Sequence, residues 1–186
     1  MESRQDLTKE LLAGCFKELM LSRPFEKITI KNITDKAGLI RPTYYKHFQD
    51  KYEVLEWIFI NEIGDEAELL IENDQFMDAL LLILRRFEKD AVFYRKAFKI
   101  PGPNGFRDVL EQYLTRIFER ELEQAADPDL FQGYATKART ARYLMHGLIS
   151  LLEDWLFDPN ACSPDEFCRC YRFLANDLRA HDKPNI

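Results

Sequence analysis

The chain has 186 residues and a mass of 22.0 kDa, with 46% hydrophobic and 31% charged residues and a formal net charge of −6. This composition supports a packed core, and with only 7 Gly and 8 Pro it argues against disordered, collagen-like and many-turned all-β chains. No apolar run approaches the roughly 18–20 residues of a membrane span, and the start of the chain has no apolar stretch behind a basic head, so we expect a cytoplasmic protein without membrane contact.

The first predicted element is an amphipathic helix that ends at about Leu21, before Ser22-Arg23-Pro24. Its apolar face is predicted from side chains that recur every four residues, with Leu12 beside them: Leu7, Leu11, Cys15 and Leu19.

Three further helices follow closely. Thr29 is placed to cap a short helix over Ile30–Ala37, and Gly38 is suited to the left-handed position after it. Pro42 fits the first position of a helix over residues 42–48, because its fixed φ suits that position and its missing N–H costs nothing there. Asp50 opens a fourth helix, which runs to about residue 72.

The rest of the chain is also helical in pattern, with segments at about residues 75–90, 92–98, 106–124, 130–157 and 164–181. We therefore predict an all-α fold of about nine helices. Residues 1–52 carry a net charge of +3 and residues 53–186 a net charge of −9. A basic head on an acidic body fits a protein that presents one face to phosphates, with the boundary near residue 52.

The second and third helices, joined by Gly38-Leu39-Ile40, have the pattern of a helix-turn-helix. In this motif the second helix presents its N-terminal residues to base edges in the major groove of DNA. Tyr44 and Phe48 share one face of the third helix and are expected to pack inward, on the side chains of Leu11, Ile33 and Leu55. The outward face is then predicted to carry these side chains: Arg41, Thr43, Tyr45, Lys46 and His47.

The outward residue types suit DNA. Arginine and lysine donate to guanine, and a threonine methyl group contacts that of thymine. Tyr45, His47 and Lys51 suit phosphate oxygens, and Thr29 and Lys31 lie at a helix N-terminus, which offers N–H groups to a phosphate. The alternatives are that His47 is an ordinary packed or solvated histidine and that Lys51 only covers the start of the fourth helix.

The region of residues 8–58 resembles the TetR family of bacterial regulators. The resemblance rests on Ala37-Gly38-Leu39, then on residues 41–48 with the sequence Arg-Pro-Thr-Tyr-Tyr-Lys-His-Phe, and on residues 50–55, Asp-Lys-Tyr-Glu-Val-Leu. Ile40 departs from the family pattern, which often has a Ser or Thr cap there. The resemblance implies two groups of DNA-contacting positions: for bases, Arg41, Pro42, Thr43 and Lys46; for phosphates, Thr29, Tyr45, His47 and Lys51.

Residues 55–59 and 93–98 resemble the subgroup of this family that includes the activator of dihydroxyacetone kinase operons. The resemblance implies that such a protein works through either a small-molecule effector or a protein coregulator.

The stretch Tyr143–Phe157 is apolar on most sides, so a helix there must be buried on most sides. A partner subunit achieves this by forming a twofold four-helix bundle; the alternative is a central helix of a monomeric core. The interface expected for a homodimer consists of Leu144, Leu148, Leu151, Trp155, Tyr171 and Leu174.

With 14 Phe, 8 Tyr and 2 Trp, the body has enough aromatic side chains to line an apolar ligand pocket. Aromatic residues at helical spacing are also typical of an ordinary core. The pocket candidates are Trp57, Phe87, Phe98, Tyr113 and Phe118.

No catalytic motif is found. The three histidines are far apart, and there is no glycine-rich phosphate loop or nucleophile elbow. The four cysteines lack the spacing of a zinc site, and we expect reduced thiols, no metal and no cofactor. The function predicted is a homodimeric, effector-controlled repressor that binds a palindromic operator in double-stranded DNA. The alternatives are an activator controlled by a protein coregulator, and an interaction module whose head does not bind DNA.

Overall fold

A computed structural model describes residues 4–123, 133 and 135–180, and within these residues it contains helices and no strand. The all-α prediction is confirmed. Among the described residues, none of the helices is both long and apolar enough to cross a bilayer. In chain order, the elements are α1 (Arg4–Ser22), η1 (Phe25–Lys27), α2 (Ile30–Ala37), α3 (Arg41–Tyr45), α4 (Lys51–Phe59), η2 (Ile60–Gly64), α5 (Asp65–Glu72), α6 (Phe76–Lys89), α7 (Ala91–Phe98), α8 (Phe106–Glu123), α9 (Lys137–Phe157) and α10 (Pro164–Ala180).

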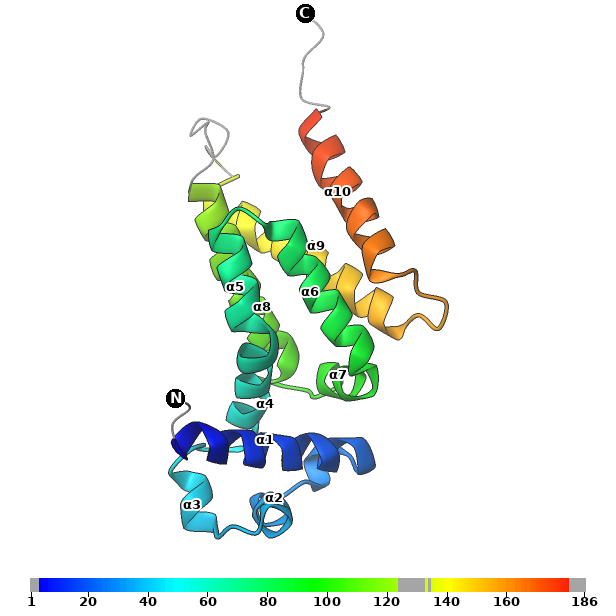
Figure 1. Ribbon diagram of the computed structural model, residues 1–186. Coiled ribbons are helices and arrows are strands. Elements are labelled where there is room, and N and C mark those ends of the chain that lie inside the picture. Colours follow the sequence, from blue (N-terminus) through cyan, green and yellow to red (C-terminus); the bar gives the residue numbers. More distant parts are fainter. Residues whose placement is uncertain (1–3, 124–132, 134, 181–186) are drawn as a thin grey trace, which may run out of the picture.

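Helices α1, α2 and α3 form a head at one end of the molecule, and α4 leads from it into the helical body (Figure 1). Helices α4 and α5 continue into each other through η2, a π-helical segment, as the predicted long fourth helix requires. The predicted boundary at residue 52 falls in the first turn of α4. Helix α10 packs on α6 and extends toward the end of the body opposite the head.

Local capping sets the limits of α2. The Thr29 hydroxyl accepts a hydrogen bond from the backbone N–H of Asn32, and the Asn32 side chain accepts one from the backbone N–H of Thr29. At the other end Gly38 has a φ of +67°, and the N–H of Leu39 reaches back to the carbonyl of Thr34 at 2.9 Å. Such a left-handed residue satisfies the last carbonyls of a helix, so the turn into α3 is fixed by sequence-local interactions.

The predicted buried face of α1 is confirmed in part. Leu7 and Leu11 are exposed, whereas three of the predicted residues are buried: Leu12, Cys15 and Leu19. Phe16 and Met20 are buried as well, and helices α2, α4 and α7 all pack on α1.

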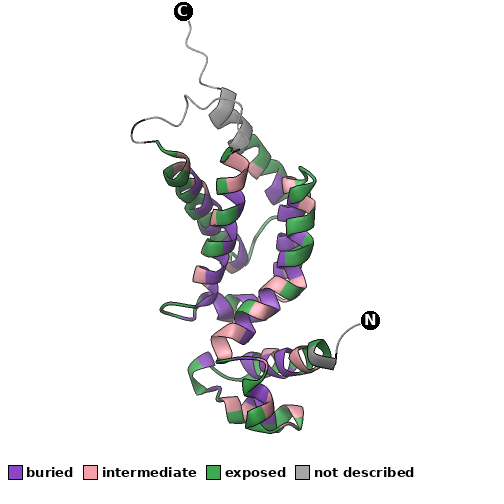
Figure 2. Cartoon of the chain, turned by 90° about the vertical axis from the view of Figure 1, so that its left-hand side faces the viewer, coloured by how far each residue is buried: buried purple, intermediate pink, exposed green. Residues whose placement is uncertain are grey.

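The core of the body is rich in packed aromatic rings, and buried residues line the inner sides of its helices (Figure 2). The ring of Phe87 lies 4.4 Å from that of Tyr94 and 6.0 Å from that of Phe98, between centroids. Phe106, at the start of α8, contacts all three rings. This cluster joins α6, α7 and α8 into one unit.

The predicted helical run over 130–157 begins later in the structure, because α9 starts at Lys137; residues 130–132 and 134 lie outside the described residues. Nothing tests the predicted run there. All four cysteines are free thiols in the structure.

We predict opposite effects of alanine at two open glycine positions in the head. A Cβ would meet no atom within 4 Å at Gly38 or at Gly14. Gly38→Ala forces a left-handed alanine and is expected to lower the free energy of unfolding by about 1 kcal/mol. Gly14→Ala, inside α1, is expected to raise it by about 0.5–1 kcal/mol. Urea denaturation followed by circular dichroism measures the free energy of unfolding of both variants. An equal change in the two would contradict the left-handed backbone at Gly38.

Candidate nucleic-acid interface

Helix α3 is anchored from behind by two aromatic side chains. Tyr44 is 0% exposed and Phe48 is 2% exposed, and their ring centroids are 5.9 Å apart. The hydroxyl of Tyr44 donates to the carbonyl of Asp50 at 2.8 Å, and burial raises the pKa of this hydroxyl. Ile33 and Leu55 are buried in the same core as predicted, whereas Leu11 is exposed and does not fill the expected position behind α3.

The outward side of α3 carries the residues that the sequence pattern places there. Arg41, Pro42, Tyr45 and Lys46 are exposed, and Thr43 is half-buried. The structure therefore brings together the four positions that the family resemblance assigns to base contacts, at the end of the molecule farthest from the described part of α10 (Figure 1).

Helix α3 is shorter than predicted. It ends at Tyr45, so Lys46 and His47 lie in the turn that follows, and Phe48 comes directly after that turn. The N–H of Phe48 still donates to the carbonyl of Tyr44 at 3.0 Å. The side chain of Phe48 therefore remains fixed in the core, and His47 is half-buried at the edge of the exposed surface.

The N-terminus of α2 lies next in the chain before this surface. Lys31 is exposed there. The hydroxyl of Thr29 is engaged by Asn32, to which it also donates at 2.9 Å, so Thr29 shapes the helix start. Ile40, the residue that departs from the family pattern, begins α3 without a side-chain cap.

The placement of Lys51 corrects its predicted role. Its ammonium group donates to the carbonyls of Phe25 at 2.7 Å and Ile28 at 3.2 Å, and it lies 4.0 Å from the centroid of the Phe25 ring. Burial lowers the pKa of this ammonium group, against the nearby carboxylates of Glu26 and Asp50, which raise it. Lys51 therefore ties the start of α4 to η1 and the segment after it, which is the alternative role considered for it from the sequence.

The five predicted pocket residues do not line a common cavity. Phe87, Phe98, Tyr113 and Phe118 are buried in contact with other rings, and Trp57 packs its ring on Phe48. Their predicted role as ligand contacts is not supported, because neighbouring side chains fill the space that a ligand would need. Two cavities of about 320 and 470 Å³ lie elsewhere. The first lies between α4 and α8 and has a mainly polar lining, and the second lies over α8 and α9 and exposes mainly apolar surface. Neither is lined by any of the five.

The predicted interface residues of α9 divide into two groups. Leu148 and Trp155 are buried within the subunit, and the indole N–H of Trp155 donates to the carbonyl of Cys162 at 2.8 Å. These two are corrected to internal packing, because their side of α9 faces the core. Leu151 is exposed and Leu144 half-buried, at the edge of the same side of α9.

On α10, Tyr171 is half-buried and Leu174 is exposed. The prediction missed two exposed aromatic residues, Tyr143 on α9 and Phe173 on α10, whose side chains are 72% and 66% exposed. Both lie in the predicted helical segments, but only the packing of α9 and α10 reveals that they face outward.

A family model described as "Transcriptional regulator C-terminal region", of TetR type, matches residues 74–177. The curated relative "HTH-type dhaKLM operon transcriptional activator DhaS" from Lactococcus lactis subsp. lactis (strain IL1403) is 37% identical over 97 residues. The alignment covers 50% of each protein, so the chain spans about half the length of the curated relative it matches.

Solved structures with similar folds cover nearly the whole chain. The dihydroxyacetone kinase operon activator DhaS has a TM-score of 0.61 at 24% identity, over 95% of this chain and 96% of that one. NalD, described as the secondary repressor of the MexAB-OprM multidrug efflux pump in Pseudomonas aeruginosa, has a TM-score of 0.64 at 20% identity, over 94% and 96%. At these identities the likeness concerns the fold.

A helix-turn-helix head on an all-helical body is the architecture of the class of transcriptional regulators to which these proteins belong. Because the family model matches more than half of its length, the chain belongs to the TetR family, and it is related to the DhaS subgroup.

We predict that Lys51 stabilises the head. Lys51→Met removes two hydrogen bonds from a charged donor, so the free energy of unfolding is expected to fall by about 1.5–3 kcal/mol. Chemical denaturation measures this change. Lys27→Met, at an exposed lysine of η1, serves as the control and is expected to change the free energy of unfolding by less than about 0.5 kcal/mol. An equal loss of stability in both variants would contradict the structural role of Lys51.

Proposed function

We propose that the protein regulates transcription as a homodimer that binds a palindromic operator in double-stranded DNA. The observation that carries this proposal is α3 with the turn that follows it, which are held by buried Tyr44 and Phe48 and expose Arg41 and Lys46. A helix with this arrangement can enter the major groove and place its first residues against base edges. Two such heads read half-sites about 34–36 Å apart, or a multiple of that distance.

The outer faces of α9 and α10 support the dimer. Tyr143, Gly147 and Leu151 lie one helical turn apart on α9 and are all exposed, and Phe173 is exposed on α10. A Cβ at Gly147 would meet nothing within 4 Å, which leaves room for a close helix from a second subunit. Pairing α9 and α10 with their twofold copies would bury these apolar side chains in a four-helix bundle.

An effector would change operator affinity by binding one arrangement of the two heads more tightly than another. The effect on transcription has two candidates. Repression is the expectation from the family, whereas activation is favoured by the 37% identical relative, which is named an activator. In vitro transcription from the operator-bearing promoter, with and without the protein, distinguishes them by the direction of the change.

We predict that Lys46 reads a base. In a binding-site selection, the wild-type protein is expected to select a palindrome, and Lys46→Ala is expected to lose preference at one position in each half-site. The loss is expected to be about 1–3 kcal/mol of discrimination, the usual contribution of a lysine-to-guanine contact. Affinity for the palindrome should fall steeply with salt, because phosphate binding releases counterions.

Lys89→Ala is the control for Lys46→Ala, since it removes the same charge from an exposed lysine at the end of α6, outside the head. It is expected to leave every position of the selected site unchanged. Selection of the wild-type sequence by Lys46→Ala would exclude a base contact, and the absence of any selected sequence for the wild-type protein would contradict the proposed function.

We predict that Leu151→Glu and Phe173→Glu each dissociate the dimer, because an unpaired carboxylate in an apolar interface carries a large desolvation cost. Light scattering after size-exclusion chromatography measures the mass. Leu69→Glu, at an exposed leucine of α5, is the matched control and is expected to remain dimeric. A dimer that persists in both test variants would place the interface elsewhere.

A further inference from the structure

The head is joined to the body in two ways. One is the continuous chain of α4, which runs from the head into η2 and α5. The other is the side of α1, which packs on α4 and on α7. A single connecting helix leaves the head free to bend and rotate at any irregular point of that helix, so a second attachment is needed to fix its orientation.

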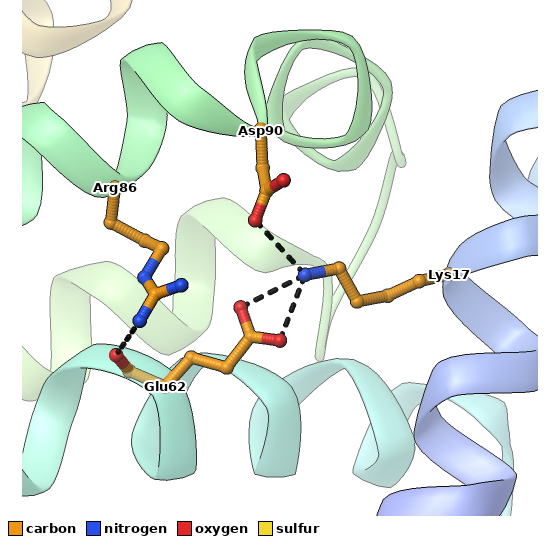
Figure 3. Close-up of polar contacts among 4 residues, drawn as sticks. All are labelled: Lys17, Glu62, Arg86 and Asp90. Carbon is orange, nitrogen blue, oxygen red and sulfur yellow. Dashed lines mark hydrogen bonds and ion pairs between the residues drawn. The ribbon is translucent and has the colours of Figure 1, made fainter.

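Lys17, on α1, supplies the main polar contact of this second attachment (Figure 3). Its ammonium group lies 2.8 and 2.9 Å from the two carboxylate oxygens of Glu62, in η2, and 3.1 Å from a carboxylate oxygen of Asp90, between α6 and α7. One lysine of the head therefore binds two separate elements of the body at the same time.

This ion cluster is partly shielded from solvent. The side chains of Lys17, Glu62 and Asp90 are 21%, 24% and 28% exposed. The ammonium group also lies 5.2 Å from the centroid of the Phe93 ring on α7. Shielded charges are screened less by salt than exposed ones, and removal of one partner leaves the others without compensation, so the geometry of this cluster is held more firmly than that of a surface ion pair.

A second lysine, which belongs to the body, strengthens the same attachment between α1 and the body. Lys96, on α7, donates to the carbonyls of Met20 and Leu21 in the last turn of α1, both at 2.8 Å. A cation at this end of a helix satisfies carbonyls that have no partner within the helix and interacts favourably with the helix dipole. Lys17 and Lys96 thus fix α1 to the body at two points along its length.

The covalent connection is irregular at the level of this cluster. Glu62 belongs to η2, where the helix widens to π geometry, and its backbone carbonyl accepts a hydrogen bond from Arg86 at 3.4 Å (Figure 3). The carbonyl of Gly64, two residues on, accepts one from the buried hydroxyl of Tyr113 at 2.9 Å. Since π segments interrupt the regular hydrogen-bond ladder, the helix has its weakest point where Lys17 binds it.

We infer that Lys17, through Glu62 and Asp90, is a positioning residue that fixes the angle between the head and the body and thereby sets the half-site spacing that the dimer accepts. The inference rests on the proposed function. Adding one base pair between the half-sites increases the distance between them by about 3.4 Å and rotates one half-site relative to the other by about 35° around the DNA axis. A head held at a fixed angle cannot follow that change, whereas a head held only by α4 can.

The test uses the full chain and the palindrome obtained by binding-site selection, with the central spacer unchanged, shortened or lengthened by one base pair. The wild-type protein is expected to prefer the selected spacing by about tenfold or more, the scale of one lost specific contact. Lys17→Met is expected to reduce that preference to about threefold or less, while recognition of the half-site sequence stays the same. Lys17→Arg, which keeps the positive charge, is expected to retain most of the wild-type spacing preference.

Lys36→Met is the matched control. Lys36 pairs with Glu18 at 2.6 Å, but both residues lie within the head, on α2 and α1. This variant is expected to keep the wild-type spacing preference, even where its overall affinity falls. Glu62→Gln removes the carboxylate charge from the body side and is expected to relax the spacing as Lys17→Met does; it also serves if Lys17→Met does not fold, as judged by circular dichroism.

The outcomes separate the two proposals. A wild-type protein that selects no palindrome contradicts the proposed function. A wild-type protein that selects one, together with folded Lys17→Met or Glu62→Gln that keeps the full spacing preference, overturns the positioning role alone. A loss of spacing preference in Lys36→Met as large as in Lys17→Met also overturns it, because the effect would then arise from any ion pair of the head.

Discussion

The anchoring of α3 by Tyr44 and Phe48 is the interaction on which the DNA-binding surface depends. A five-residue helix has too few internal hydrogen bonds to be stable alone. Burial of the two rings supplies the missing free energy, and the bond from the Tyr44 hydroxyl to the Asp50 carbonyl joins α3 to the start of α4. The outward residues are therefore presented by a short segment whose orientation is determined entirely from its inner side.

The same logic applies on a larger scale to the head. Its internal structure comes from caps, rings and the Lys51 contacts with the backbone, all within residues 12–59. Its orientation comes from elsewhere, through Lys17 and Lys96 and the body elements that they bind. In the proposed dimer, internal structure provides recognition of a half-site, whereas orientation relates one half-site to the other, so the two proposed properties depend on different sets of contacts.

Features governed by neighbours in the chain are predicted well from the sequence. Thr29 and Gly38 act within a few residues, and α2 has the predicted limits. The buried face of α1 is predicted only in part. Leu12, Cys15 and Leu19 are buried as expected, but only the packing of α2, α4 and α7 decides that Leu7 and Leu11 stay exposed.

Long-range contacts explain the remaining differences at the candidate site. Lys51 has the residue type of a phosphate contact, yet its carbonyl partners lie 23 and 26 residues away, which no local pattern indicates. Trp155 is likewise drawn inward by the segment that follows α9. The outward residues of α3 were predictable because their exposure follows from the inward position of Tyr44 in this helix and of Phe48 just after it.

The contacts among Phe87, Tyr94, Phe98 and Phe106 have a consequence for how a regulatory signal reaches the head. A molecule entering this cluster would first have to separate rings that now touch, and the free energy spent on opening would be subtracted from its affinity. The same contacts hold α6, α7 and α8 together, so that none of these helices can shift without moving the rings of the other two.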